Sequence, residues 1–192
     1  MGQKGQTPID VCPKLLCRII AFGIRRSLCI SNNREQKRWD MRIVANYVEN
    51  RPTEIIPGLI LGGIMDLENM ISMKPDVLVP LDSLPGDVWD MGFRGEILYC
   101  PITDYSILPD DVLEKLVRQM SERIKNGKRV AVFCIGGHGR TGYISACVLF
   151  QYGIKKPIEY LRENYSPFAV ESRAQESAVD RFCRTHAAGS MF

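Results

Sequence analysis

Residues 130–142 read VAVFCIGGHGRTG, and this stretch decides the fold of the 192-residue chain. The apolar run before Cys134 has the composition of a buried strand, and the apolar run over residues 141–152 that of a helix. A strand, a glycine-rich loop and a helix start in this order form an anion cradle, because unpaired backbone N–H groups converge with the positive helix end. The same dipoles favour a thiolate over a thiol. The stretch therefore predicts a site where Cys134 attacks a bound phosphate group.

The other residue types of this loop suit the transfer of a phosphoryl group. We expect the forked guanidinium of Arg140 and the backbone N–H groups before it to bind the equatorial phosphate oxygens. The hydroxyl of Thr141 is expected to donate to the Cys134 sulfur when that sulfur leaves the phosphoenzyme. The glycines allow the backbone to wrap closely around the anion. The predicted substrate-binding residues of the loop are Ile135, Gly136, Gly137, His138 and Gly139.

An ester leaving group also needs a proton, and Asp104 is the candidate general acid. It lies in a loop after an apolar run at residues 97–100. Loops at the carboxyl ends of the strands in an α/β sheet open towards the ligand crevice. The alternative is that Asp104 is an ordinary turn residue facing solvent. Asp110 and Asp111 are better interpreted as caps of the next helix.

Apolar runs and turn residues along the chain predict one α/β domain over residues 39–192. We expect a short, mostly parallel central sheet with helices on both faces. The cysteine loop is expected between the last core strand, which should be central, and a buried helix. Predicted strands cover residues 55–56, 59–61, 77–79, 97–100 and 130–133, and predicted helices begin near residues 110, 141, 157 and 172.

Charge separates the first 38 residues from the rest. Residues 1–38 hold eight Lys and Arg against two acidic residues, whereas residues 39–192 hold seventeen against twenty. The main domain is therefore no general nucleic-acid binder. The basic arm has a helical pattern over residues 13–30, which predicts either a weak contact with an anionic membrane or an extra helix packed on the domain.

The seven cysteines are scattered through mostly apolar runs, which is typical of reduced intracellular thiols. We therefore expect a cytoplasmic location. With two histidines in the chain, no Cys/His group has convincing zinc spacing, and the sequence predicts neither a metal nor another cofactor.

The order and spacing of these motifs resemble the dual-specificity branch of the cysteine-dependent protein-tyrosine phosphatase superfamily, over roughly residues 55–182. The family signature, Cys-x-x-Gly-x-x-Arg followed by Ser or Thr, is matched by Cys134, Gly137, Arg140 and Thr141. The family's Pro-x-x-Asp acid loop is matched by the stretch from Pro101 to Asp104. The resemblance implies metal-free, two-step hydrolysis of a phosphorylated protein or another phosphomonoester, with Cys134 as nucleophile and Asp104 as acid and then base.

Four residues depart from the family pattern or leave two interpretations open. Phe133 stands where the family usually has a histidine before the nucleophile. The side chain of His138 either titrates near neutral pH beside the pocket or simply lines its rim. Gln175 either places the hydrolytic water, as in some relatives, or forms a capping box with Ser172, which we favour. The resemblance also makes Cys100 a candidate for a disulfide with the nucleophile.

Three alternative functions remain open at this point. The cradle could bind phosphorylated partners without catalysis, an alternative that rests on Phe133. A rhodanese-like or arsenate-reductase enzyme also uses a cysteine–arginine loop, but Asp104 favours ester hydrolysis. Finally, the substrate could be a phosphoinositide or another non-protein ester, with the basic arm docking the enzyme on a membrane.

Overall fold

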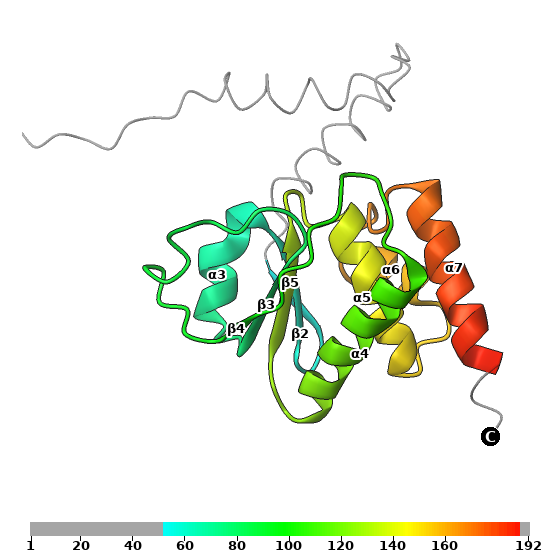
Figure 1. Cartoon of the computed structure of the whole chain (residues 1–192), viewed down its shortest axis with the longest axis horizontal. Coiled ribbons are helices and arrows are strands. Elements are labelled where there is room, and N and C mark those ends of the chain that lie inside the picture. Colours follow the sequence, from blue (N-terminus) through cyan, green and yellow to red (C-terminus); the bar gives the residue numbers. More distant parts are fainter. Residues whose placement is uncertain (1–51, 189–192) are drawn as a thin grey trace, which may run out of the picture. The chain divides into compact units, whose positions relative to one another are not determined.

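The computed structural model describes residues 52–188, so the predicted basic arm over residues 1–38 and its membrane contact lie outside the described range. Five strands form one sheet in the order β1-β2-β5-β3-β4 (Figure 1). All neighbouring pairs are parallel except β1 and β2, which form an antiparallel pair. This arrangement confirms the α/β prediction and the central place of the last strand. The strands are β1 (Thr53–Ile56), β2 (Leu59–Gly63), β3 (Val77–Pro80), β4 (Glu96–Ile97) and β5 (Val130–Cys134).

The helices cover both faces of the sheet, as predicted. Figure 1 shows α3 on one face and the four longer helices on the other. None of the helices over residues 52–188 is long and apolar enough to span a membrane. The helices are the short 3-10 helix η1 (Ile64–Asp66), α3 (Leu67–Ser72), α4 (Asp110–Lys125), α5 (Gly139–Gln151), α6 (Pro157–Asn164) and α7 (Arg173–Ala188).

Strand β5 is apolar throughout because both of its faces are buried. Val130 and Val132 pack in the larger core cluster with α4, α5, α6 and α7. Ala131 and Phe133 point the other way, into a smaller cluster with α3. A strand covered on both faces reads as a continuous apolar run rather than an alternating one. This double burial fixes the position of Cys134 at the end of β5.

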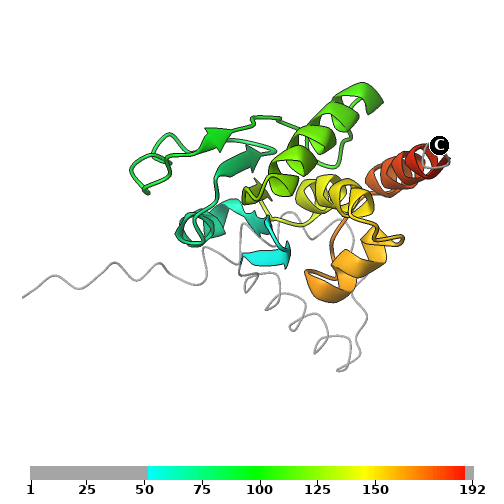
Figure 2. The same ribbon diagram turned by 90° about the horizontal axis from the view of Figure 1, so that it is seen from below.

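Helix α5 is the centre of the helical layer. It contacts α4, α6 and α7 (Figure 2), and its residues from Gly139 to Leu149 are all buried. A helix that is apolar all round is expected in such a place. Its first turn therefore lies at a rigid point of the molecule, directly after the loop that follows β5.

Three elements differ from the sequence-based expectation. Strand β4 is only two residues long, and beyond it single hydrogen bonds continue the pairing, such as Cys100 N to Pro80 O at 3.2 Å. Helix α3 was not predicted. Asp110 and Asp111 do not cap α4; Pro109 is the N-cap residue, and both carboxylates lie in the first turn, where the helix dipole favours them.

Candidate active site

The loop after β5 is held tightly against β2 and η1. Gly137 adopts a left-handed backbone with φ 76°, and a Cβ there would lie 2.7 Å from the Gly62 carbonyl carbon. Only glycine fits that conformation and that close approach. The N–H of Ile64 donates to the carbonyl of Ile135 at 3.1 Å, so the loop backbone is pinned on both sides.

Cys134 and Thr141 meet across this loop as the sequence predicts. The Thr141 hydroxyl donates to the Cys134 sulfur at 3.2 Å, and Thr141 belongs to the first turn of α5. Cys134 is only 3% exposed. The sulfur therefore lies at the amino end of a buried helix, where the helix dipole and a hydroxyl donor both stabilise negative charge.

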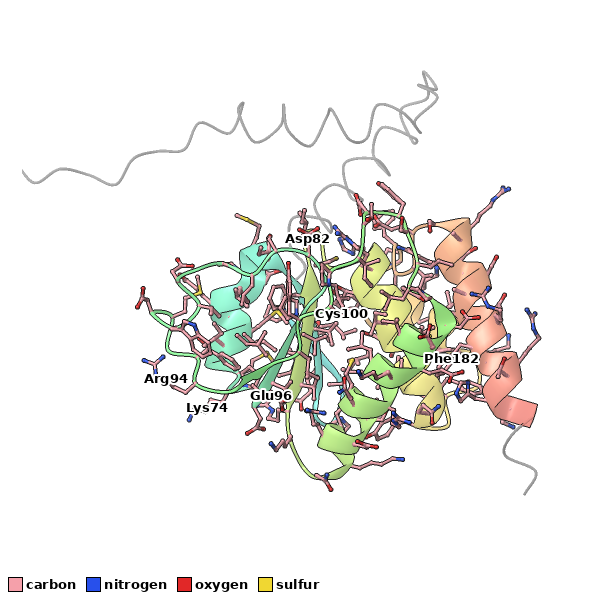
Figure 3. The ribbon with its side chains drawn as sticks, viewed as in Figure 1. Lys74, Asp82, Arg94, Glu96, Cys100 and Phe182 are labelled. Atoms are coloured by element: carbon pink, nitrogen blue, oxygen red, sulfur yellow. The ribbon has the colours of Figure 1, made fainter. Side chains whose placement is uncertain are left out.

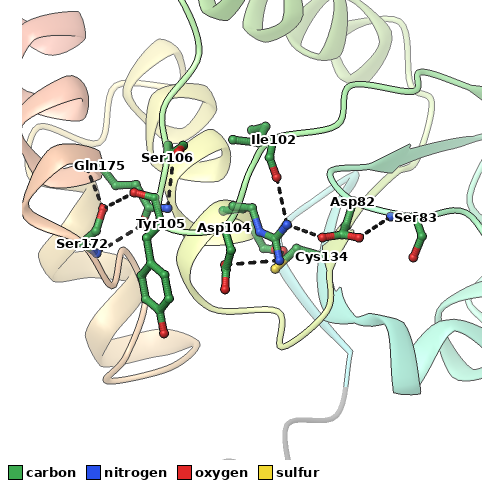
Figure 4. A network of polar contacts seen from close by, with 11 residues as sticks. Asp82, Ser83, Ile102, Asp104, Tyr105, Ser106, Cys134, Ser172 and Gln175 are labelled. Carbon is green, nitrogen blue, oxygen red and sulfur yellow. Dashed lines mark hydrogen bonds and ion pairs between the residues drawn. The ribbon is translucent and has the colours of Figure 1, made fainter. Parts of the chain in front are cut away.

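The guanidinium of Arg140 is buried and oriented by three partners (Figure 4). Its Nη1 donates to the carboxylate of Asp82 and, at 2.9 Å, to the carbonyl of Ile102. Its Nη2 lies 3.3 Å from Asp104 Oδ1. Among the residues the structure describes, Nε has no hydrogen-bond partner. A buried guanidinium N–H that has no acceptor and lies beside a thiol is suited to bind an oxyanion.

Asp82 was not a predicted site residue, although its position carries a signal. It follows β3 at the carboxyl edge of the sheet, where parallel strands present their ligand-binding loops. Burial tends to raise the pKa of its carboxyl, but the hydrogen bond from Arg140 holds that pKa below the usual range. The backbone N–H of Ser83 also donates to Asp82 at 2.7 Å. Asp82 therefore stays ionised and orients the guanidinium.

Asp104 comes to the site from the loop between β4 and α4. Its side chain is 61% exposed, so it combines contact with Arg140 and access to solvent. The loop opens on the same edge as Cys134, as the sequence predicts. Asp104 is thus no isolated turn residue, because it faces the guanidinium next to the thiol.

A second carboxylate, Glu171, faces the same corner from the segment before α7. It accepts a hydrogen bond from the backbone N–H of Gly139, and a Cβ on Gly139 would collide with its carboxylate oxygen. Burial raises the pKa of Glu171, and the charge of Asp104 raises it further. Glu171 has no spacing relative to the cysteine motif that would identify it in the sequence.

Each of these two carboxylates is next to a residue with a left-handed backbone. Tyr105 has φ 58° and Val170 has φ 63°. This region is uncommon for residues other than glycine and a clear outlier for a β-branched valine. The Val170 carbonyl accepts a hydrogen bond from Arg162 Nη2 at 3.1 Å. The backbone N–H of Val170 donates to the His138 carbonyl at 3.3 Å. Such conformations persist where surrounding contacts fix them, and they cluster at functional sites.

His138 does not line the rim of the pocket. It is 1% exposed, its Nδ1 lies 2.9 Å from the Ser166 hydroxyl, and its ring packs edge-on against Phe168. Burial lowers the pKa of His138 to about 4. The imidazole is therefore neutral near pH 7, which corrects the expectation that it titrates there. Its backbone still forms part of the loop as the N-cap residue of α5.

The remaining open residues also have defined places. Phe133 is fully buried among apolar residues on the α3 side of the sheet, so it makes no polar contact with the loop. Gln175 forms the capping box that we favoured: the Ser172 N–H donates to its side-chain oxygen at 3.2 Å, and its own N–H donates to the Ser172 hydroxyl at 3.1 Å. Cys100 is a free thiol, and burial raises its pKa. Its pairing with Cys134 stays a prediction.

A separate groove lies at the opposite end of β3 and β4. It has a volume of about 560 Å³, and its lining includes Lys74, Arg94, Glu96 and Lys128. Figure 3 shows three of these residues far from Asp82, at the other end of the sheet. None of the predicted site residues lines this groove. The predicted catalytic and substrate-binding residues therefore lie at the carboxyl edge of the sheet, away from this groove.

Comparison with protein families gives one match over most of the domain. The family described as "Swiss Army Knife protein, DSP-PTPase phosphatase domain" matches residues 78–191. Two uncharacterized proteins of Methanocaldococcus jannaschii, MJECL20 and MJ0215, are each 41% identical to the chain, over 87 and 98 residues. These alignments cover 45% and 51% of the chain, and 59% and 62% of the two relatives, so the chain spans about three fifths of their length.

Several solved phosphatase structures share the fold. The active form of Tk-PTP has a TM-score of 0.61 and 23% identity, covering 71% of this chain and 98% of its own. Human DUSP28 has a TM-score of 0.60 and 17% identity, covering 70% and 97%. PTPMT1 has a TM-score of 0.59 and 17% identity, covering 72% and 98%. At these identities the likeness concerns the fold.

Proposed function

Because the chain belongs to the DSP-PTPase phosphatase domain family, we propose that it hydrolyses aryl phosphomonoesters, above all phosphotyrosine in proteins, through a cysteinyl-phosphate intermediate. One observation carries this proposal. The Cys134 sulfur lies at the start of α5, 3.2 Å from the Thr141 hydroxyl. Beside it, the buried Nε of Arg140 has no hydrogen-bond partner among the described residues. That arrangement provides a stabilised nucleophile and an oxyanion site in one place.

In the first step, the Cys134 thiolate attacks phosphorus and the bond to the ester oxygen breaks. The loop N–H groups and the guanidinium of Arg140 bind the three equatorial oxygens, whose charge they offset. Asp104 donates a proton to the leaving oxygen. Its contact with Arg140 supports this role, because Arg140 is the side chain expected to bind the phosphate whose leaving oxygen needs the proton.

In the second step, water attacks the cysteinyl-phosphate and Cys134 leaves as a thiolate. The Thr141 hydroxyl stabilises the departing sulfur, and Asp104 accepts the proton of the water. Glu171 is a second candidate for one of these proton transfers, because its pKa is raised and it faces the amino end of α5. Exchange of the two roles between Asp104 and Glu171 is open to direct test.

Exposed apolar side chains around the loop support an aromatic leaving group. Ile135 within the loop and Tyr105 beside the acid are both exposed, and so is Met65 in η1, the helix whose first residue binds the Ile135 carbonyl. Exposed apolar side chains gathered around a polar site mark a binding surface. A phosphorylated tyrosine ring would pack against these side chains while its phosphate reaches the sulfur.

Carboxylates around the same loop disfavour a polyanionic lipid headgroup. Asp82, Asp104 and Glu171 all lie beside Arg140 or the start of α5, and the loop itself contains no lysine. Like charges at such range cost binding energy. PTPMT1 has been crystallised with PI(5)P, but at 14% identity that ligand does not transfer to this chain. We therefore place phosphoproteins before phosphoinositides as substrates.

The test is a substrate panel with the wild type and Cys134→Ser. We expect the wild type to hydrolyse aryl phosphates and phosphotyrosyl peptides much faster than inositol lipids, and Cys134→Ser to be inactive on all of them. An active Cys134→Ser variant would refute the cysteine mechanism. Binding of phosphopeptides without turnover by the wild type would instead support the silent module that Phe133 first suggested.

A further inference from the structure

The start of α7 holds the loop that carries Asp104. The Ser172 hydroxyl donates to the carbonyl of Tyr105 at 3.0 Å, and Gln175 Nε2 donates to the carbonyl of Ser106 at 3.4 Å (Figure 4). The two carbonyls that directly follow Asp104 are therefore bound by two side chains of one helix end.

The carboxamide of Gln175 has polar partners at both of its ends. Its oxygen accepts the Ser172 N–H at 3.2 Å, and its nitrogen donates to the acid loop. Gln175 is also 0% exposed. A buried side chain with both ends engaged is suited to fix backbone positions, and these bonds leave only one N–H and one oxygen lone pair of the carboxamide for any other partner.

The acid loop needs such an anchor because of its own backbone. Tyr105, the residue after Asp104, has φ 58°, which a tyrosine rarely adopts. Asp104 itself is mostly exposed, so packing does little to fix it. The hydrogen bonds from α7 therefore hold the residues that aim the Asp104 carboxyl at the site.

We propose that Ser172 and Gln175 are positioning residues that hold Asp104 over the cysteine loop, and that Gln175 does not orient the hydrolytic water. This inference rests on the proposed function, because it assigns the two residues to the proton-transfer part of that reaction. The role goes beyond the capping box. Ser172 and Gln175, which cap the start of α7, also hold the loop that carries Asp104.

The two possible roles of Gln175 differ in whether the first chemical step is affected. Protonation of the leaving group matters most when that group is a poor one, so a misplaced Asp104 slows the first step increasingly as leaving-group basicity rises. A misplaced water slows only hydrolysis of the cysteinyl-phosphate. That second defect is independent of the leaving group and makes the phosphoenzyme accumulate.

The experiment compares Gln175→Met and Ser172→Ala with the wild type on a series of aryl phosphates. We expect kcat/KM to fall about tenfold or more for the most basic leaving groups and about twofold for the most acidic ones, as partial loss of general-acid catalysis requires. Unchanged kcat/KM across the series, with a lower kcat and accumulation of the phosphoenzyme, would overturn the inference and assign Gln175 to the water, because kcat/KM reports only the steps up to formation of the cysteinyl-phosphate.

Two control variants separate positioning from stability. Ser172→Thr keeps the hydroxyl and should retain the wild-type slope against leaving-group basicity. Arg181→Ala removes the ion pair between α7 and Asp110, the first residue of α4, but keeps the hydrogen bonds to the Tyr105 and Ser106 carbonyls, so it should leave that slope unchanged. A slope change in Arg181→Ala as large as in Gln175→Met would mean that any weakening of α7 suffices, which contradicts a specific anchor.

Amide hydrogen exchange measures how firmly Ser172 and Gln175 hold the acid loop, and it does not depend on turnover. We expect faster exchange at residues 103–106 in Gln175→Met, with α5 unchanged. Unchanged exchange at residues 103–106 would refute the anchor even if the enzyme is active. Conversely, faster exchange in a protein that hydrolyses no phosphate would refute the proposed function while leaving the anchor standing, so the two failures are distinct.

Discussion

The phosphate cradle and the carboxylate rim are two parts of one site that are built in opposite ways. The cradle, residues 134–141, is one continuous segment whose strand and helix are buried on all sides. The rim brings Asp104 and Glu171 from distant loops, each beside a left-handed residue that side-chain hydrogen bonds hold in place. The difference teaches that binding and attack rest on rigid packing, whereas proton transfer rests on a few polar contacts.

Substitution of Arg140 tests the cradle and should give the largest effect. Arg140→Lys keeps the charge but loses the fork that engages Asp82, Ile102 and the phosphate together. We expect kcat/KM for an aryl phosphate to fall about 10³-fold, in the range seen when oxyanion donors are removed. Steady-state kinetics measures this. A loss below tenfold would show that the cradle binds phosphate without needing the fork.

Replacement of either rim carboxylate by its amide tests the rim. It should lower kcat/KM less than Arg140→Lys does, by an amount that depends on the substrate. We expect Asp104→Asn to lower kcat/KM about 10²-fold for poor leaving groups, because the acid is lost. Glu171→Gln keeps an acceptor for the Gly139 N–H and should cost less than about tenfold at every leaving group. The reverse ranking would make Glu171 the general acid.

The buried His138 gives the cradle an acid sensitivity that the exposed rim lacks. Burial lowers the pKa of His138 to about 4 from an ordinary value of 6.5, so the unfolded chain binds a proton that the folded chain excludes. Stability is therefore present above pH 6.5 and is lost as the pH falls towards 4. We expect the wild type to lose ~2 kcal/mol of unfolding free energy between pH 7 and pH 5 through this residue.

Urea unfolding at the two pH values, for the wild type and His138→Asn, checks this expectation. The asparagine keeps a polar partner for the Ser166 hydroxyl but does not titrate. The pH dependence of the variant should be smaller by that amount. Equal pH dependence in both proteins would mean that His138 is not the group responsible.

Asp82 connects the two parts, and its substitution should have a smaller effect on activity than loss of Arg140 or Asp104. Asp82→Asn keeps a hydrogen-bond acceptor for Arg140 but removes the charge, so we expect about a tenfold loss of kcat/KM, mainly through a higher KM. Asp90→Asn removes a carboxylate from an exposed stretch of the chain and serves as the matched control. An equal effect of both variants would attribute the loss to net charge rather than to orientation of the guanidinium.

The cradle could be predicted from the sequence, whereas most of the rim could not. The sequence around Cys134 predicted the cradle because its strand, loop and helix are consecutive and each has a local signature. Glu171 has no local signature and Asp82 has only its place after a strand, since their roles arise when the sheet edge and the start of α7 meet Arg140. Helix α3 was missed because six residues are too few to establish a helical period. The burial of His138 depended on Ser166 and Phe168, which no spacing rule connects to it.

Acid-quenched mass analysis of the enzyme during turnover of an aryl phosphate tests the central claim most directly. The account predicts one phosphoryl group on the peptide that contains Cys134, with none on that peptide in Cys134→Ser. Turnover with no phosphoryl group on Cys134 at any time point, or with the group attached to another residue, would contradict it.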